Sequence, residues 1–314
     1  MFSVVYRRLL QLVAVVFGVG TLTFILMRSL PGDMAYRIAA SRYGQDNVSA
    51  EAAEFVRAQL NLDQSALSAF GSWLMDLAQF RLGNSLVSGE PVIDTIVHQL
   101  GHSVLLAVCG IVLSIVIAFP LGLLSVKWPR AFAPFGVAFS VLFRSLPVFV
   151  IGLVLILLFA LKWQWFPVAG FGTPLHMILP TVTLALALAA TSNRIVAQST
   201  QQVVKAPYYQ FSMIKGLSPL RTFSRHGIRN ILLPVVAYLG VQFITVIEGI
   251  VMIESLFSWP GVGQGLAHAI FARDIPVIQG TALCLGVLFV LLNTLVDVLC
   301  YWIDPRIKEA NQNG

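Results

Sequence analysis

Charge is scarce in this sequence. Only 11% of its 314 residues are charged and 57% are hydrophobic, whereas roughly a quarter of the residues in soluble globular domains are charged. The composition therefore excludes an ordinary soluble domain and indicates an integral membrane protein. Cysteine is also rare: Cys109, Cys284 and Cys300 all lie in apolar runs. Three scattered thiols cannot form a disulfide framework or a metal cluster.

Sequence motifs for ATP binding and for hydrolysis are missing as well. The sequence has no G-x-x-x-x-G-K-[ST] loop to hold nucleotide phosphates. It has no Gly-x-Ser-x-Gly elbow and no pair of aspartates within its apolar runs, as an intramembrane hydrolase would need. The chain is therefore predicted not to be an enzyme. A stand-alone secondary transporter of a small solute remains the alternative, although the inverted repeats typical of that class are not visible.

Six apolar runs are long enough to predict membrane spans, since a bilayer core of about 30 Å requires about 20 helical residues. They are Leu9–Met27, Ser103–Val126, Ala131–Ala160, Met177–Ala190, Leu232–Ile253 and Val277–Ile303. The fourth run is short and Pro180 lies near its start. The first follows two arginines, as a signal peptide would, but its length predicts a retained helix. The sequence thus predicts an all-α polytopic membrane protein.

Basic residues are divided unevenly between the two sides that six spans define. The side with both termini has 12 Lys or Arg residues and two acidic residues, while the other side has seven and ten. Lys and Arg in short loops stay in the cytoplasm, so both termini are predicted to be cytoplasmic. The net charge of +6 then reflects topology and contact with the lipid bilayer, and no nucleic-acid partner is expected.

The segment between the first two spans is predicted to lie outside the cell. Residues 28–102 contain eight acidic and five basic side chains and predict a small helical lobe. Within it, Ser49–Leu62 is a helix candidate with Ser49 as its N-cap. Three regions are therefore expected: an N-terminal transmembrane helix over residues 1–30, an extracytoplasmic lobe over 31–102, and a core over 103–314.

The loop at residues 194–230 is basic and has strong helix punctuation. Its part from Lys205 to Asn230 carries five Lys or Arg residues and no acid. Pro207 can begin a helix, Gly216 can end it, and Ser218 can cap a second one. The loop is thus predicted to form two short helices. Contact with anionic lipid would explain the charge, but not this pattern.

Side chains in the first of these helices suggest a docking surface. Tyr208, Phe211 and Ile214 recur at helical spacing and would line one face. A helix that exposes an aromatic face outside the membrane needs a protein surface to cover it.

Nine motifs in register, together with this loop, resemble the permease subunits of bacterial ABC importers of the peptide, nickel and opine class. The motifs are SLPGD (Ser29–Asp33), LNLDQ (Leu60–Gln64), FRLGNSLVSGEPV (Phe80–Val92), SLPVFVIG (Ser145–Gly152), WFPVAG (Trp165–Gly170), MILP (Met177–Pro180), IESLFSWPGVG (Ile253–Gly263), RDIPVIQG (Arg273–Gly280) and NTLVDVLCYWIDPRI (Asn293–Ile307). The resemblance covers nearly the whole chain.

The resemblance implies a six-helix type I importer permease in the bacterial inner membrane. Its expected partners are a second permease, two ABC ATPase subunits that bind the ATP, and an external substrate-binding protein; no cofactor of its own is expected. The cargo would be peptides, nickel or metal chelates, and the 269–280 segment is more similar to nickel-type permeases.

The same resemblance assigns coupling to the ATPases to the basic loop. The family has Glu-Ala-Ala there, then three residues and a glycine. Here Gly216 matches the glycine, but the triplet is Gln210, Phe211 and Ser212. The coupling residues expected from the loop and the resemblance are Tyr208, Gln210, Phe211, Ser212, Gly216 and Arg225.

Two charged residues within the predicted spans are candidates for the translocation pathway. Arg144 precedes Ser145 and Pro147 in the third run, and Glu248 lies in the fifth. A charge at the bilayer centre costs on the order of 3 kcal/mol, so it should face a cavity or a partner. The two side chains would border the pore as a pair. Alternatively, Arg144 snorkels or binds carbonyls that Pro147 frees.

The turn after the fifth run is a candidate outer gate. Trp259, Pro260, Gly261 and Gly263 are expected to form a tight turn, and the resemblance implies that it dips toward the membrane. The alternative is a rigid connection with an interfacial tryptophan.

His98 and His102 are four residues apart, a spacing that would place two imidazoles on one helix face. However, Gly101 suggests a helix boundary between them. Ordinary polar residues near the membrane surface are the expected interpretation.

Overall fold

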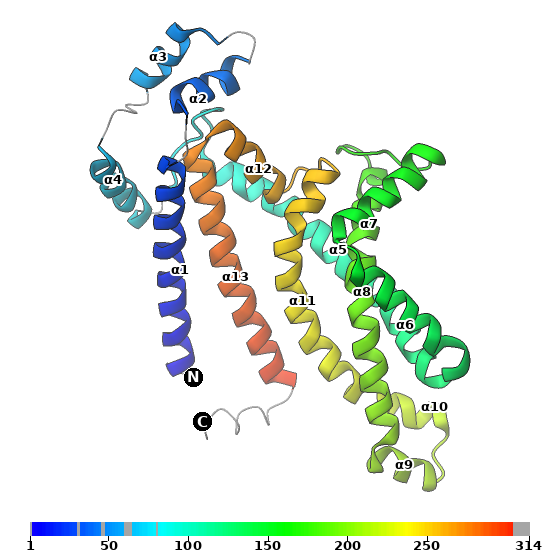
Figure 1. The fold of residues 1–314 in the computed structure, drawn as a ribbon. Helices are drawn as coiled ribbons and strands as arrows, with labels where there is room; N and C mark the ends of the chain where they lie inside the picture. The colour runs from blue at the N-terminus through cyan, green and yellow to red at the C-terminus, as the bar shows by residue number, and fades with distance from the viewer. Residues whose placement is uncertain (1, 30–31, 45–47, 60–64, 80, 304–314) are drawn as a thin grey trace. The chain divides into compact units, whose positions relative to one another are not determined.

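The computed structural model describes residues 2–29, 32–44, 48–59, 65–79 and 81–303, and Figure 1 shows their helices. The elements are α1 (Phe2–Ser29), α2 (Met34–Tyr43), α3 (Ala50–Gln59), α4 (Ala66–Ala78), α5 (Val92–Lys127), α6 (Pro129–Ser145), α7 (Val148–Leu155), the π-helix η2 (Ile156–Lys162), α8 (Pro174–Lys205), α9 (Pro207–Ile214), α10 (Pro219–Thr222), the π-helix η3 (Phe223–Gly227), α11 (Ile228–Leu256), α12 (Val262–Ala272) and α13 (Ile275–Ile303). Among these residues, the only extended pairing is an isolated bridge between Asn84 and Pro91.

The predicted all-α membrane fold is confirmed, and each of the six apolar runs lies in a helix or a bent helix pair. Among the described residues, α5, α8 and Ile275–Leu295 of α13 are each long and apolar enough to span a membrane. The pair formed by α6 and the 148–162 segment passes the same test as a unit. The first and fifth runs lie within α1 and α11.

The third predicted span is not continuous, which corrects the sequence interpretation. The two halves of this span, Pro129–Ser145 and Val148–Lys162, meet at an angle of 102°. Proline disfavours helical geometry in the residue before it, and Leu146 accordingly adopts ψ 132°. Pro147 is the N-cap of α7, so the chain bends where a straight span was predicted.

The fourth predicted span is much longer than its apolar run. Pro180 lies inside α8, and the helix continues past Ala190 to Lys205. Its last turns bury small polar side chains, including Ser192, Asn193 and Thr200. Hydropathy therefore missed this part of the helix because its buried face is polar.

The chain forms two compact units, the first comprising Met1–Ser103 and Pro260–Leu291. In this unit, Val92 and Ile96 of α5 pack against Ala269, Val277 and Ile278. Close approach is possible because Gly280 lacks a side chain: a Cβ there would lie 2.7 Å from Val92 and 3.0 Å from Ile96. The start of α5 is thus held between α12 and α13.

Helices α2 and α3 form a separate small core in the first unit, around Ile38 and Val56. The predicted helix at Ser49–Leu62 is confirmed as α3, and the Ser49 hydroxyl accepts a hydrogen bond from the N–H of Ala52 at 3.2 Å. The predicted end at Leu62, and the Leu60–Gln64 motif, lie outside the described residues. Asp33 caps α2, because its carboxylate accepts the N–H of Ala35 at 2.9 Å, and such caps favour the start of short helices.

The second unit comprises Val104–Trp259 and Leu292–Gly314. Buried amides hold its helices together: Asn193 of α8 donates to the Gly136 carbonyl at 2.9 Å and to Ser140 at 3.1 Å on α6. Gln242 of α11 donates to the Leu188 carbonyl of α8 at 2.9 Å. Both α6 and α11 are therefore fixed to α8, the helix from which the basic loop emerges.

Candidate functional site

The basic loop folds into two short capped helices, as predicted. Helices α9 and α10 lie at the C-terminal end of α8 (Figure 1). Pro207 is the first residue of α9, and Gly216 has φ +87°. The N–H groups of Gly216 and Leu217 donate to the Met213 and Ser212 carbonyls at 3.0 and 3.3 Å. This is a Schellman ending, which needs a left-handed residue at the position of Gly216.

Helix α10 begins at the predicted cap. The Ser218 hydroxyl accepts a hydrogen bond from the N–H of Arg221 at 3.4 Å, and Pro219 is the first helical residue. The direction of both helices is therefore set by local chemistry within the Lys215–Ser218 connection.

One face of α9 is apolar and uncovered. Tyr208, Phe211 and Ile214 expose 45%, 57% and 81% of their surface, and these three residues are called the α9 apolar face below. The Lys215 ammonium lies 4.7 Å from the centroid of the Phe211 ring, and Gln210 is exposed beside it. The face is apolar with a basic edge, as a surface for a partner with acidic residues would be.

The opposite side of α9 is anchored to the second unit. Tyr209 packs against a core that includes Val203 and Ile231, and burial raises the pKa of its phenol. Ser212 is buried and donates to the Tyr209 carbonyl at 2.7 Å. A force applied to the α9 apolar face would thus reach α8 and α11 through packed side chains. Arg225, in contrast, is exposed on η3.

The candidate pathway residues are partly described. Arg144 lies in the last turn of α6, exposed, directly before the bend at Pro147, and not in the middle of a straight span. A cation is favourable there because the end of a helix carries partial negative charge. Ser145 donates to the Leu142 carbonyl at 3.0 Å. Glu248 lies on α11, but its side chain is outside the described part, so the pairing with Arg144 stays a prediction.

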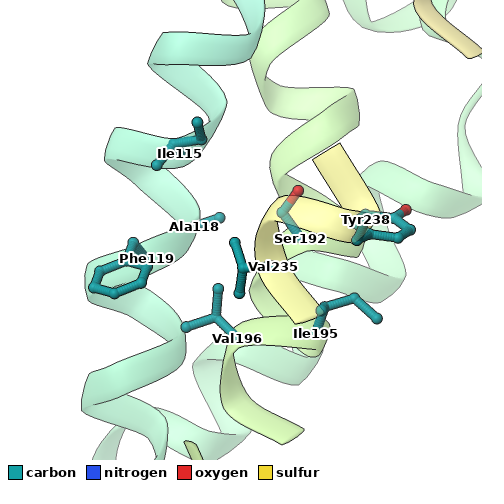
Figure 2. A pocket seen from close by; sticks show the side chains of 8 residues that line it. All are labelled: Ile115, Ala118, Phe119, Ser192, Ile195, Val196, Val235 and Tyr238. Carbon is teal, nitrogen blue, oxygen red and sulfur yellow. The ribbon is translucent and has the colours of Figure 1, made fainter. Parts of the chain in front are cut away.

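A small pocket lies between α5, α8 and α11 (Figure 2). It measures about 10 Å³ and is lined by Ile115, Ala118, Phe119, Ser192, Ile195, Val196, Val235 and Tyr238. The Ser192 hydroxyl donates to the Leu188 carbonyl of its own helix at 3.0 Å. Sites for small molecules measure about 300–1,000 Å³, so this pocket is a packing gap and not a cargo site.

The candidate outer gate is a buried turn. Trp259 exposes only 2% of its surface, and its ring meets that of Phe171 edge to face, with the centroids 5.2 Å apart. The left-handed residue of the turn is Ser258 (φ +49°), whereas the sequence pointed to glycines. The backbone N–H of Trp259 donates to the Glu254 carbonyl at 2.8 Å. The tryptophan is therefore part of the core of the second unit.

Pro260, Gly261 and Gly263 lead into α12. Gly261 is the N-cap of this 11-residue apolar helix, and both glycines are buried. The first N–H of the helix, that of Val262, donates to the hydroxyl of buried Ser103 on α5 at 2.8 Å. An apolar helix of this length is too short to cross a bilayer. The dip of this segment toward the membrane, which the resemblance implies, stays a prediction.

A buried carboxylate that the sequence analysis passed over organises the first unit. Asp274 exposes 4% of its surface and accepts hydrogen bonds from the Ser85 hydroxyl at 2.5 Å and from the N–H of Leu86 at 3.0 Å. Beside it, Arg273 has φ +57° and donates to the Gly32 carbonyl at 3.0 Å. The sequence offered one signal for this contact, namely the polar residues in the 80–92 and 273–280 motifs. No local pattern indicates, however, that the two motifs lie close together.

Glu254 is a second buried acid that hydropathy did not place. It is fully buried in the last turn of α11, one residue beyond the predicted span. The backbone carbonyl of Glu254 accepts the backbone N–H of Trp259, so this residue is part of the turn that leads to Trp259.

Comparison with known proteins identifies the family. A family model described as "Binding-protein-dependent transport system inner membrane component" matches residues 110–309. The chain belongs to this family. It is therefore a permease subunit, located in the inner membrane with several helices crossing it, and not an enzyme.

Similar proteins match over almost the full length of the chain. The glutathione transport system permease protein GsiC of Pectobacterium atrosepticum is 34% identical over 303 residues, 96% of this chain and 97% of that protein. A putative peptide transport system permease protein of Brucella abortus is 35% identical over 317 residues, 98% and 99% of the two chains. GsiC of Escherichia coli K12 is 33% identical over 309 residues, 98% and 99%. The resemblance to ABC importer permeases of the peptide class is confirmed.

One solved structure supports the fold independently. The crystal structure of an amino acid ABC transporter with histidines has a TM-score of 0.52, with 13% identity, covering 66% of this chain and 93% of that one. At this identity the likeness concerns the fold alone.

Proposed function

We propose that this chain forms, with a second homologous permease, the pathway through which an ATP-driven importer takes up short peptides of the glutathione type. The similarity over nearly the whole length to permeases named for glutathione and for peptides carries this proposal. The nickel and metal-chelate cargoes that the sequence left open have no support from these names. Two ATPase subunits and an external binding protein would complete the importer.

The α9 apolar face is the proposed contact with an ATPase subunit. It is uncovered, it has a basic edge at Lys215, and its helix is anchored to the transmembrane core through Tyr209. Closure of the ATPases would move α9, and the packed helices would transmit the motion to the pathway. ATP would bind only to the partners, because this chain has no phosphate-binding loop. On this proposal both termini and the α9–α10 loop are cytoplasmic.

Purification of the whole complex and its reconstitution into vesicles tests this proposal. With binding protein and ATP present, we expect glutathione or a dipeptide to accumulate inside, and Ni²⁺ to compete with neither. Uptake without ATP, or a complex that contains no ATPase subunit, would contradict the proposal. Uptake of Ni²⁺ but not of peptides would retain the importer and overturn the cargo.

A further inference from the structure

Two histidines near the start of α5 lie closer together than the sequence analysis allowed. Gly101 was expected to mark a helix boundary, but α5 runs without interruption from Val92 to Lys127. His98 and His102 therefore occupy adjacent turns of one helix. Their Nε2 atoms are 3.4 Å apart, and the ring centroids are separated by 4.9 Å.

This separation suits shared coordination of one metal ion. Zn²⁺ binds imidazole nitrogen at about 2.0–2.1 Å with tetrahedral geometry, which places two such nitrogens about 3.3–3.4 Å apart. The ring planes meet at 84°. The outer torsion of a histidine side chain is broad, so the exposed ring of His98 can turn its Nε2 lone pair toward an ion that His102 also binds.

Neither imidazole is enclosed by the first unit. His98 is exposed and His102 is partly exposed. The helix itself is rigid at this point: Val92 and Ile96 are buried in the first unit, and Ser103 is held by the N–H of Val262. A rigid scaffold preserves the spacing between two ligands.

We propose that His98 and His102 form a two-histidine site for a divalent late transition metal such as Zn²⁺. In the described part of the chain, no group of three His, Cys, Asp or Glu residues could hold an ion. Water or an exogenous ligand would therefore complete the coordination sphere. The result is an exchangeable site with open positions, unlike the closed four-ligand sites that stabilise folds. This site is independent of the proposed cargo.

The site lies one residue before the hydrogen bond that fixes the start of α12. Ser103 follows His102 directly, and its hydroxyl accepts the first N–H of the helix that comes after the candidate outer gate. An ion bound to both imidazoles would add a cross-link between two turns of α5 directly before this contact.

Metal titration of the intact importer complex, purified through a tag without histidines, tests the proposal. We expect one high-affinity Zn²⁺ site per chain. Co²⁺ bound at this site should give the visible spectrum of tetrahedral Co²⁺, and added Zn²⁺ should remove that spectrum by displacing the Co²⁺. His98→Ala and His102→Ala should each weaken this site about 100-fold, because the second imidazole acts as an intramolecular ligand. The double variant should lose more affinity than either single variant, but less than the product of the two single losses, because either substitution alone already breaks the chelate.

His268→Ala provides the matched control, since His268 is an exposed histidine on α12 of the same unit. It should leave Zn²⁺ affinity unchanged. A Zn²⁺ affinity in the double variant equal to that of the unaltered chain would overturn the proposal. Independent effects, in which the free-energy losses of the two single variants add up to that of the double variant, would also overturn it. In either case the two histidines would form only a ring contact. If the complex with His102→Ala does not assemble, the Zn²⁺ affinity of the His98→Ala complex tests the proposal, because His98 is exposed and its replacement should not disturb folding.

Discussion

Two segments of this permease show opposite arrangements of apolar and polar side chains. The α9–α10 loop leaves the large apolar side chains of Phe211 and Ile214 exposed, although capped backbone groups set its shape. The 85–88 turn of the first unit, in contrast, is held by the buried carboxylate of Asp274. The first segment exposes an apolar surface, whereas the polar groups of the second form hydrogen bonds within the first unit.

The difference separates a surface meant for a partner from a structural joint. Exposed apolar side chains on a helix anchored from behind are typical of a surface that a partner protein covers, as proposed for α9. A buried acid with several hydrogen-bond donors indicates a fixed connection whose disruption is destabilising. Mutations should therefore affect association in the first segment and folding in the second.

Replacement of Gly216 should have the largest effect. Gly216→Leu places a branched side chain at φ +87°, which only glycine adopts without strain, and we expect it to abolish ATP-driven uptake while the subunit still reaches the membrane. The cause is the backbone and not crowding, because a Cβ there would meet nothing within 4 Å. Asparagine tolerates the left-handed region, so Gly216→Asn should retain much of the uptake. Normal uptake by a well-expressed Gly216→Leu variant would refute this role.

A matched pair of phenylalanines tests whether the α9 apolar face is specific. Phe211 of α9 and Phe55 of α3 expose 57% and 61% of their surface. Phe211→Asp should weaken retention of the ATPase subunits by roughly 30-fold, as expected for an interface residue worth about 2 kcal/mol. Phe55→Asp should retain them fully. The affinity of ATPase subunits for the two purified variant permeases checks both expectations. Equal losses of affinity in the two variants would show that the α9 apolar face is not a specific contact.

Removal of the buried carboxylate should destabilise the first unit without affecting the ATPases. Asp274→Ala leaves the Ser85 hydroxyl and the Leu86 N–H without their acceptor, which costs about 2–3 kcal/mol. Hydrogen exchange should therefore accelerate at residues 85–88. Asp94→Asn is the control because Asp94 is exposed. Unchanged exchange in Asp274→Ala would show that the turn is held by other contacts.

The smallest effect is expected at the ion pair between Asp33 and Arg57, 2.7 Å apart. Burial alone would raise the pKa of Asp33, but hydrogen bonds from Arg57 and from the N–H of Ala35 outweigh it and lower the pKa below its usual 3.8. The pair thus stabilises the α2–α3 lobe above that pH, and this contribution is lost as the pH falls through the lowered value. Both side chains are over 40% exposed, so at most about 1 kcal/mol is involved.

Hydrogen exchange in α2 and α3 as a function of pH measures this contribution. Arg57→Gln should remove the part of the acid sensitivity that comes from the Asp33–Arg57 pair, while the hydrogen bond from the N–H of Ala35 retains a smaller part. An identical pH dependence in Arg57→Gln and in the unaltered chain would show that the pair does not stabilise the lobe.

Local signals in the sequence were sufficient for the caps of α9 and α10 and for the existence of the apolar helices. Pro207, Gly216 and Ser218 act on residues within four positions, so their effects can be read directly. The bend at Pro147 was missed because the hydropathy of a segment does not report the direction in which its helix axis runs. The extension of α8 was missed because its buried face includes Asn193 and Thr200. The link between Ser85 and Asp274 spans 189 residues, and no periodicity records such a contact.

Cross-linking from position 214 tests most directly whether α9 is the contact with the ATPases. In a chain whose three cysteines are replaced by alanine, Ile214→Cys would carry a thiol-attached photocrosslinker in the assembled complex. We predict capture of an ATPase subunit from position 214, and none from Phe55→Cys in the same background. Labelling of Ile214→Cys by an impermeant reagent outside intact cells, or an intact complex without that cross-link, would contradict this account.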